Sequence, residues 1–186
     1  LPGESVFFGN IAKFDLNTRH SKVQLPKGST SGKVSYGSFN SDEINGGDLK
    51  IYYAPVNVGV LTASTISLNN ITDAEIASVI NTKLTSNSSG LTIKKLESDV
   101  ELSTKFGELL ISEVISGLKN FKLDLNFSEA TIDLNNLKEN IEVLFADTVK
   151  SNKKISKDVT LNGNFSVKNS SVTIKGNQSK ITIKKK

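Results

Sequence analysis

One pattern recurs through nearly the whole chain: a small residue is followed by apolar residues two and four positions later. Its clearest copies lie in residues 106–111 and 127–132, where an aromatic residue comes directly before the small one. Successive small residues are 16 to 21 positions apart, and so regular a period is typical of repeat architectures. The small residues of the series are Ser21, Gly37, Ala54, Thr72, Ser89, Gly107, Ser128, Ala146, Gly163 and Ser179.

The spacing of two and four positions puts side chains on one face of an extended strand. A small residue before each strand indicates a tight corner, where a larger side chain would clash or φ must be unusual. We therefore predict an all-β fold, a single-stranded right-handed β-helix (β-solenoid) of about ten coils with roughly 17 residues each. At about 4.8 Å per rung, the rod would be about 45–50 Å long. The alternative is a chance periodicity in a chain rich in Val, Ile and Ser.

Right-handed coiling is favoured over left-handed coiling because left-handed hexapeptide helices keep a nearly constant coil length. Here the coil length varies and the strands alternate with a period of two. The strand positions expected to be buried are Leu49, Ile51, Val56, Val58, Val60, Leu91, Ile93, Leu96, Val100, Leu102, Leu109, Ile111, Val114, Leu123, Leu125, Ile132 and Leu134.

The length of 186 residues fits a single solenoid domain over residues 1–186. Residues 1–12 show no clear repeat and would cap the open N-terminal end of the core. Two segments also allow a helical interpretation, residues 73–80 and residues 134–145. The repeat is poorest near Ala146, so residues 136–152 are expected to form an irregular or helical insertion.

The position before the small residue is aromatic or His in six of ten copies, and equivalent residues of stacked coils form ladders. His20, the only His, is therefore predicted to stack on Tyr36, and Phe106 and Phe127 are predicted to stack in the same ladder. A surface platform of Tyr52 with these two phenylalanines, for stacking against sugars, is the alternative.

Few residues could carry catalytic chemistry. The chain has no Cys, which excludes disulfides and thiol nucleophiles, and no nucleotide-binding or metalloprotease motif is present. Glu108 and Glu129 hold the same outward position in successive coils, and glycosidases use paired carboxylates about 5–10 Å apart. With Arg19 as the only guanidinium, a solvent-exposed face is the favoured interpretation. We predict no enzyme activity, no catalytic, cofactor-binding or metal site, and no cofactor.

The charge is uneven along the chain. Residues 1–147 hold 13 basic and 18 acidic side chains, whereas residues 148–186 hold ten Lys and one acid. A cationic end could approach an acidic surface. The favoured interpretation is that Lys180, Lys184, Lys185 and Lys186 protect an exposed sheet edge from other chains. No apolar run is long enough to cross a membrane, no signal peptide is visible, and a chain without Met is expected to be a processed product.

The segments 34–39 and 103–111 and the ending 176–186 resemble a bacterial family of adhesin-like proteins with a single-stranded β-helix, of the auto-transporter adhesin head type. The resemblance covers most of residues 13–186, although Ser88, Asn162 and Thr148 depart from the pattern. It implies a protein that is exported to the periplasm or to the cell surface or outer membrane.

The resulting expectation is a non-enzymatic surface or envelope protein, an adhesin or binding module that presents a solenoid face to a surface glycan or a protein ligand. No nucleic acid partner is expected. The alternative is a structural scaffold that self-associates into homo-oligomers. A carbohydrate-active β-helix enzyme is the third and least favoured hypothesis, because fold-level analogy is weak evidence for an activity.

Overall fold

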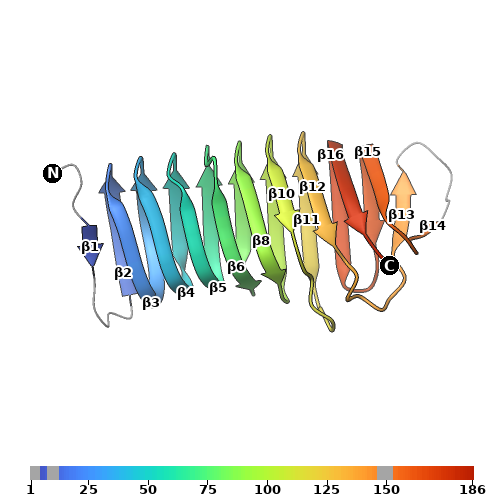
Figure 1. Cartoon of the computed structure of the whole chain (residues 1–186), viewed down its shortest axis with the longest axis horizontal. Coiled ribbons are helices and arrows are strands. Elements are labelled where there is room, and N and C mark those ends of the chain that lie inside the picture. Colours follow the sequence, from blue (N-terminus) through green and yellow to red (C-terminus); the bar gives the residue numbers. More distant parts are fainter. Residues whose placement is uncertain (1–4, 8–12, 146–152) are drawn as a thin grey trace.

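The protein is a rod built from strands and turns (Figure 1). The computed structural model describes residues 5–7, 13–145 and 153–186, and no helix occurs in these ranges. Consequently no segment of the described chain is a helix that could cross a membrane. The strands are β1 (Ser5–Phe7), β2 (Lys13–Arg19), β3 (Lys22–Ser35), β4 (Ser38–Tyr52), β5 (Val56–Asn69), β6 (Ala74–Ile80), β7 (Lys83–Asn87), β8 (Gly90–Leu96), β9 (Val100–Lys105), β10 (Glu108–Ile111), β11 (Phe121–Asn126), β12 (Glu129–Asp133), β13 (Glu142–Phe145), β14 (Lys153–Lys154), β15 (Val159–Lys168) and β16 (Val172–Lys184).

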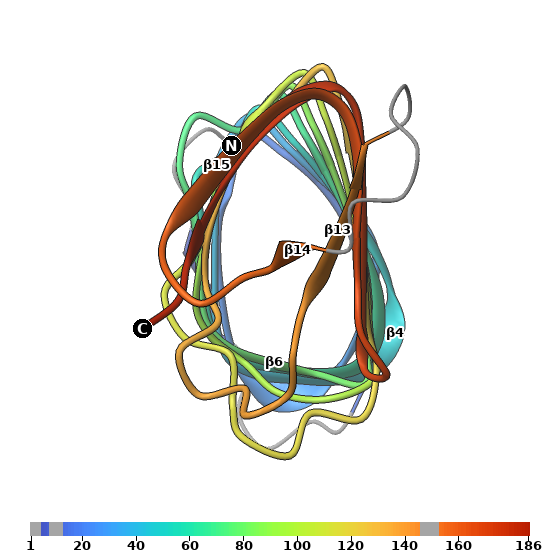
Figure 2. The same ribbon diagram turned by 90° about the vertical axis from the view of Figure 1, so that its right-hand side faces the viewer.

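Parallel strands stack along the rod as a β-solenoid of about seven turns with a spacing near 18 residues. Viewed along the rod, successive coils superimpose around one closed outline (Figure 2). One side of the coil is made by β3, β4, β5, β6, β8, β10 and β12, which pair in that order. The predicted β-solenoid fold is confirmed.

The interior is filled by ladders of equivalent side chains, because parallel pairing in register places the same coil position one rung above the last. Phe39 pairs with Val56, and Leu109 pairs with both Leu91 and Ala130. Nearly every position predicted to be buried is buried. Val60 is the exception, since it is 36% exposed while Leu61 is fully buried. The coil bends between Val58 and Leu61, so the inward spacing changes there from two residues to three.

The last rung does not come from the next coil in sequence. Ala130 in β12 pairs with Ile181 in β16, whose residues lie 51 positions later in the chain. Between these strands the chain forms β13, β14 and β15, which pair in antiparallel orientation. β15 covers the outer edge of β16, and β13 pairs with the other edge of β15. Figure 1 shows β16 lying between β12 and β15.

The prediction of about ten coils was therefore too high. Gly163 begins no new coil, because it lies in antiparallel β15, and Ala146 lies outside the described residues. Ser179 is correctly placed on the ladder, directly beside Ser128. The excursion of 51 residues equals three steps of 17, so the period alone could not distinguish three more coils from one returning strand.

The protection of a sheet edge by the C-terminal lysines is contradicted, because β16 pairs on both sides. Lys180 instead forms an ion pair with Glu129 at 2.5 Å, and the Lys185 ammonium donates to the carbonyl oxygens of Leu134 and Leu137. These lysines hold the end of the rod together.

Both helical alternatives were wrong for the residues described. Residues 74–80 are strand β6, and residues 134–141 are turns that lead into β13. The predicted insertion at 136–152 is thus irregular in its first part, and residues 146–152 lie outside the described ranges. Of the predicted cap at 1–12, only β1 is described, and it adds a parallel partner to β3.

Candidate functional site

Successive coils turn an equivalent corner at a residue with positive φ. The candidate site lies at this corner. In seven of the eight copies the N–H group of this residue donates to the carbonyl oxygen of the residue before the equivalent corner of the next coil, as from Tyr36 to Tyr52 at 3.0 Å and from Phe106 to Asn126 at 3.1 Å. In the eighth copy the Gln178 N–H donates to the side-chain oxygen of Asn164 at 2.9 Å. The residues of this corner are His20, Tyr36, Tyr53, Asn70, Ser88, Phe106, Phe127 and Gln178, with φ between 45° and 56°.

Glycine occupies the position after the corner in two coils because the preceding coil passes very close there. A Cβ atom added at Gly37 would lie 1.8 Å from the Ser21 carbonyl oxygen, and one at Gly107 would lie 2.3 Å from that of Ser89. The predicted clash is confirmed, whereas the unusual φ belongs to the residue one position earlier. In one coil the assignment was off by one: Asn70 is the corner residue, so Ile71 rather than Thr72 follows it.

Serine at the small position connects neighbouring coils. The Ser128 hydroxyl donates to the Asn126 carbonyl oxygen at 2.8 Å and accepts the Gly107 N–H at 3.3 Å. In the same way Ser179 accepts the Ser128 N–H at 3.1 Å. A hydroxyl therefore satisfies backbone groups that the tight corner leaves outside the regular strand pairing.

The aromatic residues of this corner stack on one another, as predicted. The ring of His20 lies 5.2 Å from that of Tyr36, which lies 4.9 Å from Tyr53 with an interplanar angle of 1°. Phe106 and Phe127 form a separate stack at 5.3 Å. These rings are solvent-exposed rather than part of the core, with exposed fractions of 44–55% for the two tyrosines and two phenylalanines.

The rarest residue types of the protein lie at the stack of His20, Tyr36 and Tyr53. The only Arg, the only His and all three Tyr of the chain lie in three successive coils, and we call this group, Arg19, His20, Tyr36, Tyr52 and Tyr53, the N-terminal cluster. The Arg19 guanidinium lies 5.4 Å from the centre of the Tyr36 ring, and the Lys33 ammonium lies 4.9 Å from that of Tyr52. Tyr and Arg are enriched among the residues that dominate binding energies at interfaces.

The sugar platform considered from the sequence, Tyr52 with Phe106 and Phe127, is not formed, because the phenylalanine pair lies three coils beyond the tyrosines. Asn70 and Ser88 separate the two stacks. The sequence period predicted the ladder but did not show that its rings are exposed or that Arg19 lies over the Tyr36 ring. The run of rare residues at equivalent coil positions was the signal that could have found the cluster.

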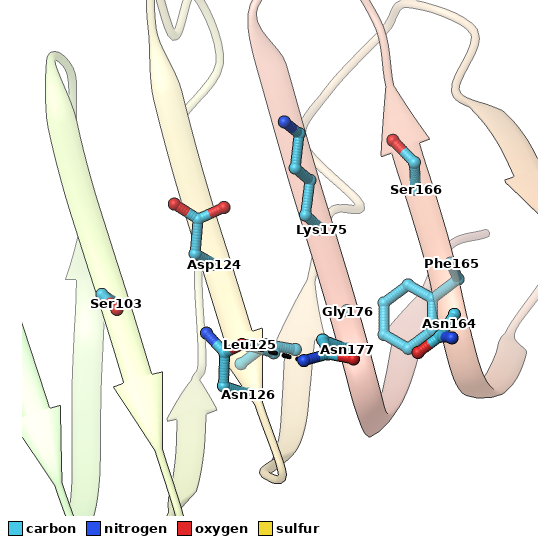
Figure 3. A pocket seen from close by; sticks show the side chains of 10 residues that line it. All are labelled: Ser103, Asp124, Leu125, Asn126, Asn164, Phe165, Ser166, Lys175, Gly176 and Asn177. Carbon is cyan, nitrogen blue, oxygen red and sulfur yellow. Dashed lines mark hydrogen bonds between the residues drawn. The ribbon is translucent and has the colours of Figure 1, made fainter. Parts of the chain in front are cut away.

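Away from the N-terminal cluster, a concavity lies across β11, β16 and β15, with a volume of about 550 Å³ (Figure 3). Side chains from neighbouring strands line it, with Asp124, Lys175 and Ser166 in one row, and the Asn177 amide donates to Asn126 at 3.3 Å. The ring of Phe165 covers Gly176 and is itself buried. The groove can therefore offer hydrogen bonds and charges to a polar ligand, but no exposed ring.

Glu108 and Glu129 are direct partners in neighbouring strands, as the sequence indicated, and both line a shallow concavity. Glu129 is already paired with Lys180, at 2.5 Å. His20 is engaged in the aromatic stack. Within the described ranges no group of three His, Asp or Glu side chains is placed to hold a metal ion.

The fold defines the protein as a parallel β-solenoid, with an exposed aromatic and cationic cluster on one corner. Comparisons with protein-family models, with curated proteins and with solved structures gave no match.

Proposed function

We propose that this protein is a non-enzymatic binding module of the bacterial cell surface or envelope, an adhesin-like protein that holds a glycan or protein ligand at the N-terminal cluster. The observation that carries the proposal is the gathering of Arg19, His20 and the three tyrosines at one exposed corner. The resemblance to adhesin-like β-helices supports the exported location.

Energetics support a role beyond stability. A non-glycine residue in the left-handed region costs about 1–2 kcal/mol, and a stacked aromatic pair contributes about 0.5–1.5 kcal/mol. Asn tolerates this conformation and occupies the same corner at Asn70. Exposed rings at Tyr36 and Tyr53 thus offer little clear stability over Asn.

The proposal is tested with a screen of glycans, polysaccharides and surface proteins that also records product formation. We expect binding without turnover, lost in the double variant Tyr36→Asn and Tyr53→Asn. The matched control is Phe106→Asn with Phe127→Asn, which changes the same corner in other coils. Binding that survives the tyrosine variant would contradict the proposal.

The two alternatives have distinct outcomes in the same experiment. Turnover that is abolished by Glu108→Gln or Glu129→Gln would identify a carbohydrate-active enzyme. Concentration-dependent self-association without ligand binding would identify a scaffold. The scaffold has less support from the rod's C-terminal end, where antiparallel β15 and β13 replace the parallel edge that a further coil would need.

A further inference from the structure

We propose that the ligand of the N-terminal cluster is an acidic polysaccharide, which lies along the rod axis with its carboxylates facing Arg19 and the neighbouring lysines. This inference rests on the proposed function and adds the chemistry of the ligand.

The first observation is a local excess of positive charge. The three coil segments that flank the cluster, residues 17–25, 33–41 and 50–58, contain Arg19, Lys22, Lys33 and Lys50 and no Asp or Glu. This contrasts with residues 1–147 as a whole, which hold 13 basic and 18 acidic side chains. A one-signed surface attracts ligands of opposite charge over long range.

The second observation is that these cations have no anionic partner. Among the described residues, none of the four forms an ion pair, whereas Lys27 and Lys94 elsewhere do. Lys33 and Lys50 are direct partners in neighbouring strands, and like charges in that position repel each other. An anion bound between them would relieve the repulsion.

The guanidinium of Arg19 adds directional recognition. It projects five N–H donors in a planar fork that matches the two oxygens of a carboxylate, and its one aromatic contact leaves donors available. The Tyr36 and Tyr53 phenol groups can donate to and accept from sugar hydroxyls. A polymer that carries both carboxylates and hydroxyls satisfies both kinds of group.

The third observation favours a polysaccharide over a single-stranded nucleic acid. Proteins bind nucleic acid strands by stacking bases on free aromatic faces. Here the faces between His20, Tyr36 and Tyr53 are occupied by one another at 4.9–5.2 Å, and their edges are left for the ligand. The cations recur once or twice per coil, which suits a polymer whose charges repeat along the axis.

The test measures binding of the full chain to three probes: an alginate oligosaccharide, an uncharged glucan of the same length and single-stranded DNA. We expect alginate to bind, the glucan to bind at least tenfold more weakly, and affinity for alginate to fall as salt is raised. Arg19→Asn should weaken alginate binding by about 10- to 100-fold, because a hydrogen-bonded charge is lost.

The replacement by Asn keeps the local fold, because Asn69 holds the position of Arg19 in another coil and Asn70 that of Tyr36. The matched control is Lys105→Asn, which removes a cation from that same position further along the rod and should leave binding unchanged. Circular dichroism of each variant confirms that the coil is intact.

The outcomes separate the inference from the proposed function. Equal binding of glucan and alginate, with loss in Tyr36→Asn, would overturn the acidic ligand and leave the binding module in place. Binding of DNA in preference to alginate, or of no probe, would also overturn the inference. Alginate binding that survives both Arg19→Asn and Tyr36→Asn would overturn the assignment of the site itself.

Discussion

Single residues determine how this chain turns its corners. At the corner of the aromatic stacks, the residue in the left-handed region is followed by Ser, Gly or Ala in seven of eight copies and by Ile71 in the eighth. A second corner uses the same conformation at Ala63, Asn81 and Asp99, with φ of 48–56°. At this corner Ser64 repeats the bridging bonds, since its hydroxyl donates to the Thr62 carbonyl oxygen and accepts the Gly46 N–H.

Ala63→Gly should stabilise the protein. Ala at φ 51° bears the left-handed penalty of about 1–2 kcal/mol, which exceeds the roughly 0.5–1 kcal/mol of extra chain entropy that Gly loses on folding. We expect the free energy of unfolding to rise by about 0.5–1 kcal/mol in urea denaturation. The control Ala77→Gly, in strand β6 without positive φ, should lower it by a similar amount. A loss of stability at both positions would contradict the strain assigned to Ala63.

Ser128→Ala should destabilise the protein by about 1–3 kcal/mol, because the Gly107 N–H loses its acceptor in a confined corner. Chemical denaturation measures the change. The control is Ser112→Ala, an exposed serine whose hydroxyl forms no hydrogen bond in the described structure, which should stay within about 0.5 kcal/mol of the wild type. Equal effects of the two substitutions would show that the hydroxyl bridge contributes nothing.

At this scale the sequence was informative about spacing and less so about exposure. The stack of His20 on Tyr36 and the register of Glu108 with Glu129 follow from the period alone. The period could not show that the rings face solvent, because an outward corner and an inward strand position recur at the same interval. The inward position of Leu61 in place of Val60 was missed because a bend adds one residue between inward positions.

Among the elements, β16 has the most unusual environment. It pairs in parallel with β11 and β12 on one side and antiparallel with β15 on the other. Its buried side chains, such as Ile174 and Ile181, continue the core ladders of the preceding coils. The strand therefore joins the repeating part of the rod to its antiparallel end.

A cysteine pair tests this placement in a chain that has no Cys of its own. Thr131 and Thr182 are direct partners in β12 and β16, at the separation between neighbouring strands that a disulfide can bridge. We expect Thr131→Cys with Thr182→Cys to cross-link on oxidation, seen as a mobility shift on non-reducing gels.

The control pair is Thr131→Cys with Thr160→Cys, which should not cross-link, because β16 lies between these two strands. Cross-linking of the control pair alone would mean that β15, rather than β16, follows β12.

Sequence analysis could not predict this element order. Residues 176–186 show the same alternation of apolar and polar residues as any other coil. The alternation does not show which strand they pair with. The antiparallel pairing of β13 and β15 could not be predicted from the repeat spacing, because the spacing does not depend on the direction of a strand. The helical spacing near residues 134–145 reflects buried Leu134, Leu137 and Ile141 in turns, whose side chains pack over the end of the core.

The whole molecule is a rod with two different ends. Among the described residues, β1 and β2 form the N-terminal end, where each pairs with β3, whereas the other end is closed by β15 and β13. The cationic cluster lies near the first end, and the acidic pair of Glu108 and Glu129 lies further along the same corner, where Lys180 neutralises part of it. The excess of positive charge thus lies in the N-terminal coils, whereas Glu108 and Glu129 are accompanied by Lys105 and Lys180, which favours the N-terminal coils as the place for an anionic ligand.

Removal of residues 134–186 should cause self-association. It uncovers the strands β11 and β12, whose unpaired backbone groups are a template for another chain. Light scattering coupled to size-exclusion chromatography should show particles that grow with concentration, and the full chain is the control. A folded, monomeric truncated chain would contradict the role assigned to β16.

The late position of β16 in the chain also has a consequence for the order of events during synthesis. The coils from β3 to β12 can each pair with a neighbour already made, but the rung beside β12 is supplied by residues that emerge 51 positions later. The rod therefore keeps an open edge until those residues arrive. A polypeptide interrupted before Val172 lacks the strand that covers β12, so completion of this edge reports that translation has passed through β16.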